Sequence, residues 1–138
     1  MVMNFRFHFV FVALFAVMLA ACSQQDLRSQ ASTTLTAAID IDGCQPARWV
    51  VPGGAAITAT FTNDTTNTAQ WDVLIYPATP PYDGMDKENF FIAFSIPANT
   101  THTEEFTAPA MPGEYQVLCS QASKLDKTPK ATLVVVQP

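Results

Sequence analysis

Histidine is scarce in this 138-residue chain, which has only His8 and His102, and its three cysteines form no Cys-x-x-C pair. His8 precedes an apolar leader, and His102 lies in a polar stretch before an expected strand. A nucleophile–histidine–acid arrangement therefore has no support. The missing Cys-x-x-C spacing also removes the usual signal of thiol–disulfide catalysis. We expect that the protein is not an enzyme.

Basic residues are also few. The chain has 7 Lys and Arg against 12 Asp and Glu, for a formal net charge of −5, and the basic residues do not cluster. Nucleic-acid-binding proteins carry a basic patch or stripe that holds the phosphates. The composition therefore predicts no nucleic-acid partner.

The N-terminus has the pattern of an export signal. A short polar start containing Arg6 precedes an apolar run over residues 9–21, which is shorter than the roughly 20 residues of a membrane-spanning helix. The run ends at Leu19-Ala20-Ala21-Cys22, which resembles a lipobox. That resemblance implies cleavage before Cys22 and acylation of this cysteine. The alternative is an ordinary secretory signal that happens to contain a cysteine.

Three segments follow from this pattern. Residues 1–21 are the expected lipoprotein signal peptide. Residues 22–34, rich in Ser, Gln and Thr after lipidated Cys22, are expected to form a flexible tether. Residues 35–138 suffice for one small domain. The expected location is extracytoplasmic, lipid-anchored to a bacterial membrane, either in the periplasm or on the cell surface.

The domain sequence alternates with a period of two, which is typical of half-buried strands. In the first run, Leu35, Ala37, Ile39 and Ile41 share one face. No segment of the domain has the pattern of an amphipathic helix. We expect about eight short strands in an all-β Greek-key β-sandwich. They cover residues 35–41, 48–51, 55–61, 71–76, 90–96 and 101–106, a run from 112–113 to 119, and residues 131–136.

The domain resembles a cupredoxin over roughly residues 36–136. The matching features occur in the order of that family: Cys44-Gln45-Pro46, Pro52-Gly53-Gly54, Asn63, Gln70-Trp71-Asp72-Val73, and Pro112-Gly113-Glu114-Tyr115 leading to Cys119. The resemblance implies that Cys119 occupies the position of the copper-binding cysteine.

The sequence departs from the family at the other copper ligands. A type 1 copper site needs two histidines, one cysteine and usually a weak methionine. The first histidine is expected near Gln70 or Trp71, and the second, with the methionine, within residues 120–129, but none is present. We therefore expect no blue-copper electron carrier. The cupredoxin-like domain of EfeO-type iron-uptake proteins departs in the same way, and this resemblance implies copper or iron as the candidate metals.

Strand order is expected to bring Cys44 and Cys119 together. In a Greek-key sandwich, the strand after Cys44 and the strand that ends at Cys119 place these two residues at the same end. A disulfide is one interpretation, because nothing outside the cytoplasm keeps adjacent thiols reduced. A metal site formed by Cys44, Cys119 and Asp72 is the second, since thiolates suit soft ions. A pair that binds metal when reduced and releases it when oxidised is the third.

Two functions follow from these features. The first is a cell-envelope binding module for metal handling, with copper or iron as the metal, and it rests on the family resemblance. The second is a metal-free, disulfide-stapled structural or protein-interaction domain. The expected partners are the membrane, through the lipid anchor, and a metal ion or another envelope protein.

The lipobox gives the first testable prediction. Cys22→Ser removes the thiol that receives the lipid, so the variant is expected to remain unprocessed or become soluble. Membrane fractionation with labelled palmitate measures both effects. A Cys22→Ser protein that still fractionates with membranes at the size of the processed wild type would contradict the lipobox assignment.

Overall fold

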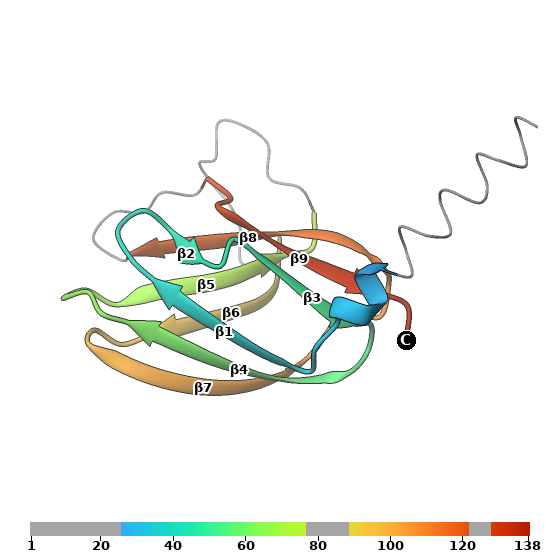
Figure 1. The fold of residues 1–138 in the computed structure, drawn as a ribbon. Coiled ribbons are helices and arrows are strands. Elements are labelled where there is room, and N and C mark those ends of the chain that lie inside the picture. Colours follow the sequence, from blue (N-terminus) through green and yellow to red (C-terminus); the bar gives the residue numbers. More distant parts are fainter. Residues whose placement is uncertain (1–25, 77–88, 122–127) are drawn as a thin grey trace, which may run out of the picture.

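Period-two alternation along the chain produces a fold made almost entirely of strands. The computed structural model describes residues 26–76, 89–121 and 128–138 (Figure 1). Nine strands lie within these ranges: β1 Thr34–Ile39, β2 Cys44–Gln45, β3 Arg48–Pro52, β4 Ala56–Asn63, β5 Ala69–Leu74, β6 Phe90–Ile96, β7 Thr100–Thr107, β8 Gly113–Gln121 and β9 Ala131–Val136.

The strands form two sheets packed face to face. One sheet has the order β2-β1-β4-β7 and the other the order β3-β9-β8-β5-β6. β1 pairs in parallel with β4, and β3 pairs in parallel with β9, whereas the remaining pairs are antiparallel. The expected all-β Greek-key sandwich is confirmed.

The alternation determines which face of each strand is buried. In β4, the side chains of Ile57, Ala59 and Phe61 are buried, while the threonines between them face outward. β5 differs because five of its six residues are buried, on both faces of the sheet.

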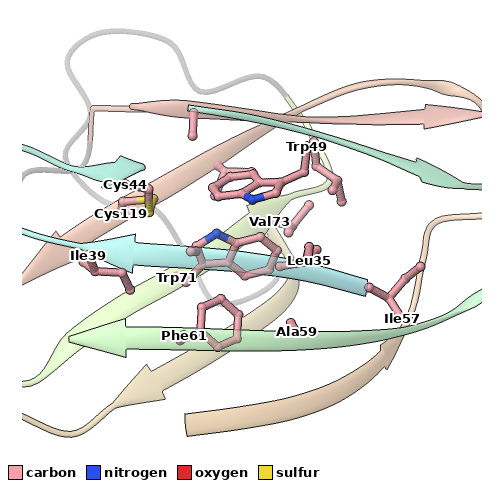
Figure 2. Close-up of a cluster of buried hydrophobic side chains, with 14 of the residues drawn as sticks. Leu35, Ile39, Cys44, Trp49, Ile57, Ala59, Phe61, Trp71, Val73 and Cys119 are labelled. Atoms are coloured by element: carbon pink, nitrogen blue, oxygen red, sulfur yellow. A yellow bond between two sulfur atoms is a disulfide. The ribbon is translucent and has the colours of Figure 1, made fainter. Parts of the chain in front are cut away.

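Aromatic side chains fill the middle of the core (Figure 2). Trp71 is fully buried, and its ring centroid lies 5.2 Å from that of Phe61 and 5.7 Å from that of Trp49. Trp49 in β3 also links the two sheets, because its indole Nε1 donates a hydrogen bond of 2.8 Å to the carbonyl of Thr36 in β1. Aromatic contacts of this kind contribute about 0.5–1.5 kcal/mol each beyond their buried area.

The first strand is shorter than the sequence pattern over residues 35–41 predicts. β1 ends at Ile39, and the side chain of Ile41 is 76% exposed instead of continuing the buried face. The cause is a local turn, because the Asp40 carboxylate accepts hydrogen bonds from the backbone N–H groups of Asp42 and Gly43. Such a side-chain turn ends the strand and reverses the chain toward β2.

The expected tether is ordered over part of its length. Residues 26–30 form one helical turn at the end of the sandwich where the C-terminus lies (Figure 1). The Arg28 guanidinium donates a hydrogen bond of 3.0 Å to the Gln137 side chain, and the Ser32 N–H donates one to the Val50 carbonyl. In the part of the chain that the structure describes, no helix has the length and apolar character needed to cross a membrane.

Candidate functional site

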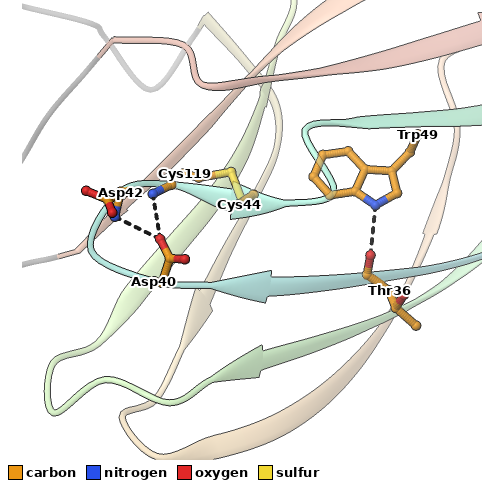
Figure 3. Close-up of a disulfide and its surroundings, with 7 residues drawn as sticks. Thr36, Asp40, Asp42, Cys44, Trp49 and Cys119 are labelled. Atoms are coloured by element: carbon orange, nitrogen blue, oxygen red, sulfur yellow. Dashed lines mark hydrogen bonds between the residues drawn. A yellow bond between two sulfur atoms is a disulfide. The ribbon is translucent and has the colours of Figure 1, made fainter.

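A disulfide joins the two sheets at one end of the sandwich (Figure 3). Cys44 lies in β2 opposite Ile39, and Cys119 lies in β8 opposite Trp71. Their Cα atoms are 5.7 Å apart, within the usual range for a disulfide, and each residue is only 3% exposed. The structure thus brings together the two cysteines that strand order places at the same end.

Trp71 fills the space beside this disulfide. It faces the core from β5, directly opposite Cys119 in β8, and it is fully buried. The indole Nε1 of Trp71 has no hydrogen-bond partner among the described residues. The nitrogen-bearing edge points toward Trp49 in a T-shaped contact with an interplanar angle of 76° (Figure 2). An aromatic face is a weak acceptor for such an N–H group.

Asn63 organises the loop next to the disulfide end. Its side chain is fully buried, and its amide Nδ2 donates to the carbonyls of Asn67, Ile96 and Pro97. Its Oδ1 accepts from the N–H and the hydroxyl of Thr65. Every polar atom of this side chain is therefore used in holding two loops together, and none is available to a ligand.

Asp72 does not join the cysteines. Side chains alternate along β5, so Asp72 points to the face of the sheet opposite to Trp71, and it pairs with Leu118 instead of Cys119. It is 4% exposed, and burial raises the pKa of its carboxyl from 3.8 to about 7. Of the expected metal set, Cys44 and Cys119 therefore meet between the two sheets, whereas Asp72 lies on the other face of the sheet that contains β5 and β8.

The remaining donors do not form a cluster around the disulfide. Among the described residues, no group of three His, Cys, Asp or Glu side chains could hold a metal ion. His102 lies in β7 opposite Phe61, where its Nε2 is 2.6 Å from a carboxylate oxygen of Glu104. The family's second histidine and methionine are expected within residues 120–129. Residues 122–127 of that region lie outside the described part of the chain.

Gln121 is one residue of this end that the sequence pattern does not single out. It is 8% exposed, and its Nε2 has no partner among the described residues. It lies two positions after Cys119 and therefore on the same face of β8. A polar residue at the end of an alternating strand is typical of the surface, so the sequence carries no signal of this burial.

Solved structures of several cupredoxins share this fold. Auracyanin from Roseiflexus castenholzii, in a dithionite-reduced crystal structure, is 27% identical with a TM-score of 0.60, over 77% of this chain and 98% of that one. Auracyanin A from Chloroflexus aurantiacus, described as a "blue" copper protein, is 21% identical with a TM-score of 0.57, over 74% of this chain and 97% of that one.

A third neighbour is rusticyanin from Thiobacillus ferrooxidans, which is 18% identical with a TM-score of 0.54, over 76% of this chain and 79% of that one. No protein-family model matches the chain, and neither does the sequence of any curated protein. The two sheets and these neighbours together show that the domain has the cupredoxin fold, as the sequence resemblance implies.

The disulfide leads to a prediction about stability. It closes a sequence separation of 75 residues, which in the chain-entropy model stabilises the fold by about 4 kcal/mol. Reduction is therefore expected to lower the melting temperature by about 10 °C or more in a domain of this size. Calorimetry with and without a phosphine reductant measures the shift. The double variant Cys44→Ala/Cys119→Ala is the matched control, because it should melt at the lower temperature and ignore the reductant. If the reductant does not change the melting temperature of the wild type, even after the protein has been unfolded in it, the prediction is wrong.

Asp72 leads to a prediction about pH. Its carboxyl has a pKa of about 7 in the folded protein and 3.8 as its ordinary value, so between these values the folded state holds a proton that the unfolded state has lost. The stability contributed by protonated Asp72 is thus fully present below about pH 4 and lost as the pH rises through about 7.

Asp72→Asn keeps the shape without the charge, so it should melt above the wild type at about pH 8, and the gap should close toward about pH 4. Asp64→Asn is the control, because it removes the same charge from an exposed loop position. A difference between Asp72→Asn and wild type that stays constant with pH would argue against a titrating buried carboxyl.

Proposed function

We propose that this chain is a lipid-anchored domain of the bacterial envelope that uses the cupredoxin fold without a resident metal, as a disulfide-stapled domain for interaction with another envelope protein. The observation that carries the proposal is the Cys44–Cys119 disulfide. It lies where the cupredoxin resemblance puts the copper-binding cysteine, and its sulfurs are bonded to each other.

The side chains at this end do not suit a type 1 copper site. Copper of this type needs imidazole nitrogens in addition to a thiolate. Trp71 takes the position opposite Cys119, and an indole N–H is a donor that offers no lone pair to a metal. A disulfide sulfur carries no thiolate charge, and thiolate is the form of cysteine that ligates metals. The chemistry of the donors therefore favours a binding domain over an electron carrier.

The disulfide end also offers a surface to a partner protein. Ile41 projects from the loop between β1 and β2 with 76% of its side chain exposed, between the exposed Asp40 and Asp42. The Asp40 carboxylate holds this loop through two backbone hydrogen bonds (Figure 3). An apolar side chain on a fixed loop loses little conformational freedom on binding, which favours its use as a contact.

Metal handling is the second candidate, and the proximity of the two sulfurs favours it. A thiol reductant supplies two electrons and two protons to the disulfide, and the resulting pair of thiols suits Cu(I), which displaces the protons. Copper comes into consideration because one neighbour is described as a copper protein. Iron comes into consideration only through the resemblance to EfeO-type domains.

Metal titration of the oxidised and the reduced protein separates the two candidates. The proposed function predicts no intense blue colour with Cu(II), and no stoichiometric retention of Cu(II), Cu(I) or Fe(II) after desalting in either redox state. Cys44→Ser/Cys119→Ser is the matched control for the thiols. One equivalent of Cu(I) on the reduced wild type, absent from this variant, would overturn the metal-free proposal in favour of metal handling.

A further inference from the structure

We infer that the end of the sandwich formed by Gly53, Gly54, Ala110, Met111 and Pro112, here called the apolar tip, faces the lipid bilayer, and that the disulfide end points away from it. The inference rests on the proposed lipid anchor at Cys22. It goes beyond the anchor because it gives the domain one orientation relative to the bilayer and names the apolar tip as the surface that contacts the membrane.

The length of chain between the anchor and the fold limits where the domain can lie. Asp26 begins the helical turn, and Cys22 precedes it by four residues. Four residues span at most about 14 Å even when fully extended. The point of entry into the bilayer therefore lies within this distance of Asp26, whatever path the intervening residues take. A tether that reached to residue 34 would allow this distance to be about three times larger.

The helical turn is fastened beside the apolar tip. Arg28 bonds to Gln137, one residue beyond the end of β9, and Leu27 lines the same cleft as Pro112 and Gly113. Figure 1 shows the turn and the C-terminus together at one end of the sandwich, with β2 at the other. The short connection to Cys22 therefore pulls this end toward the membrane.

None of the five residues of the apolar tip is charged, although Arg28 and Glu114 line the cleft beside Pro112. The N–H of Gly53 donates to the Val136 carbonyl and that of Gly54 to the Pro109 carbonyl, which ties the turn after β3 to the loop before β8. A Cβ at Gly53 would lie 3.1 Å from the Ala110 carbonyl oxygen, which is tighter than ordinary van der Waals contact, so this close approach favours glycine. Met111 projects from the tip with 74% of its side chain exposed. A flexible thioether chain of this kind enters the headgroup region readily.

The opposite end carries more exposed acidic side chains. Its loops expose Asp40, Asp42 and Asp64. The tip end also has acidic residues, but Glu114 there is paired with Arg48 at 3.5 Å, and Asp26 shares its helical turn with Arg28. Anionic lipid headgroups repel exposed acidic residues. The two ends are also well separated, since the part of β8 between Gly113 and Cys119 spans about 20 Å at the rise of a strand. The distance thus keeps the disulfide end in the aqueous compartment, and its acidic loops disfavour contact with lipid.

Two residues with nearly equal exposure provide a matched test. Met111 is 74% exposed at the apolar tip, and Ile41 is 76% exposed at the disulfide end. The lipidated protein has no free thiol, because Cys22 is acylated and the other two cysteines form the disulfide. Met111→Cys and Ile41→Cys can therefore each carry one fluorophore on the full lipidated chain. The proteins are reconstituted into phosphatidylethanolamine–phosphatidylglycerol vesicles that contain a nitroxide-labelled lipid. Ala110→Cys and Asp64→Cys repeat the comparison from different loops, in case a label disturbs either position.

Quenching by the nitroxide lipid is expected to be several-fold stronger at positions 111 and 110 than at positions 41 and 64. Equal quenching at both ends, or stronger quenching at position 41, would overturn the orientation while leaving the anchor in place. Flotation of the vesicles is measured first. A protein that does not float with them contradicts the lipid anchor of the proposed function, and the orientation fails with it.

Discussion

The two sheets of this domain are joined by a covalent bond at one end and by hydrogen bonds that cross between them elsewhere. The Cys44–Cys119 disulfide links β2 to β8 beside Trp71, while the Trp49 indole donates to the Thr36 carbonyl in β1 and the Ser32 N–H donates to the Val50 carbonyl in β3. Trp71 lies fully buried between the sheets, beside the disulfide and in contact with Trp49. The two ends of the sandwich define the surfaces that the protein presents to its surroundings.

Much of the fold could be predicted from the sequence, because alternation with a period of two is itself the physical cause of a half-buried strand. The expected strands over residues 90–96 and 131–136 coincide with β6 and β9. The pairing of the two cysteines was also predictable as one of three interpretations, since strand order alone places them at the same end. The cupredoxin resemblance places Cys119 at the position of the copper-binding cysteine, and the solved structures agree with the fold that this resemblance implies.

The features that could not be predicted depend on contacts that a pattern does not contain. Ile41 continues the alternation of the first strand, but hydrogen bonds to the Asp40 side chain end that strand two residues earlier. Residues 26–30 have the composition of a linker, yet Arg28 finds a partner in Gln137, which is 109 positions away. Asp72 lies close to Trp71 in sequence, but the pleat of β5 separates the face it occupies from that of the disulfide. The first outcome depends on a local side-chain turn, the second on a long-range partner, and the third on whether a residue occupies an odd or an even position in its strand.

The disulfide and the missing histidines have one physical explanation. Two adjacent thiols outside the cytoplasm oxidise to a disulfide, whose sulfurs no longer carry the thiolate charge that ligates a metal. Cys44 in β2 gives Cys119 a covalent partner in place of a metal. A histidine opposite Cys119 would then be a buried polar ring with no metal to bind. Trp71 fills that place with apolar contacts to Trp49 and Phe61. Stability at this end then comes from a bond within the chain, and under the proposed function the surrounding loops serve recognition instead of coordination.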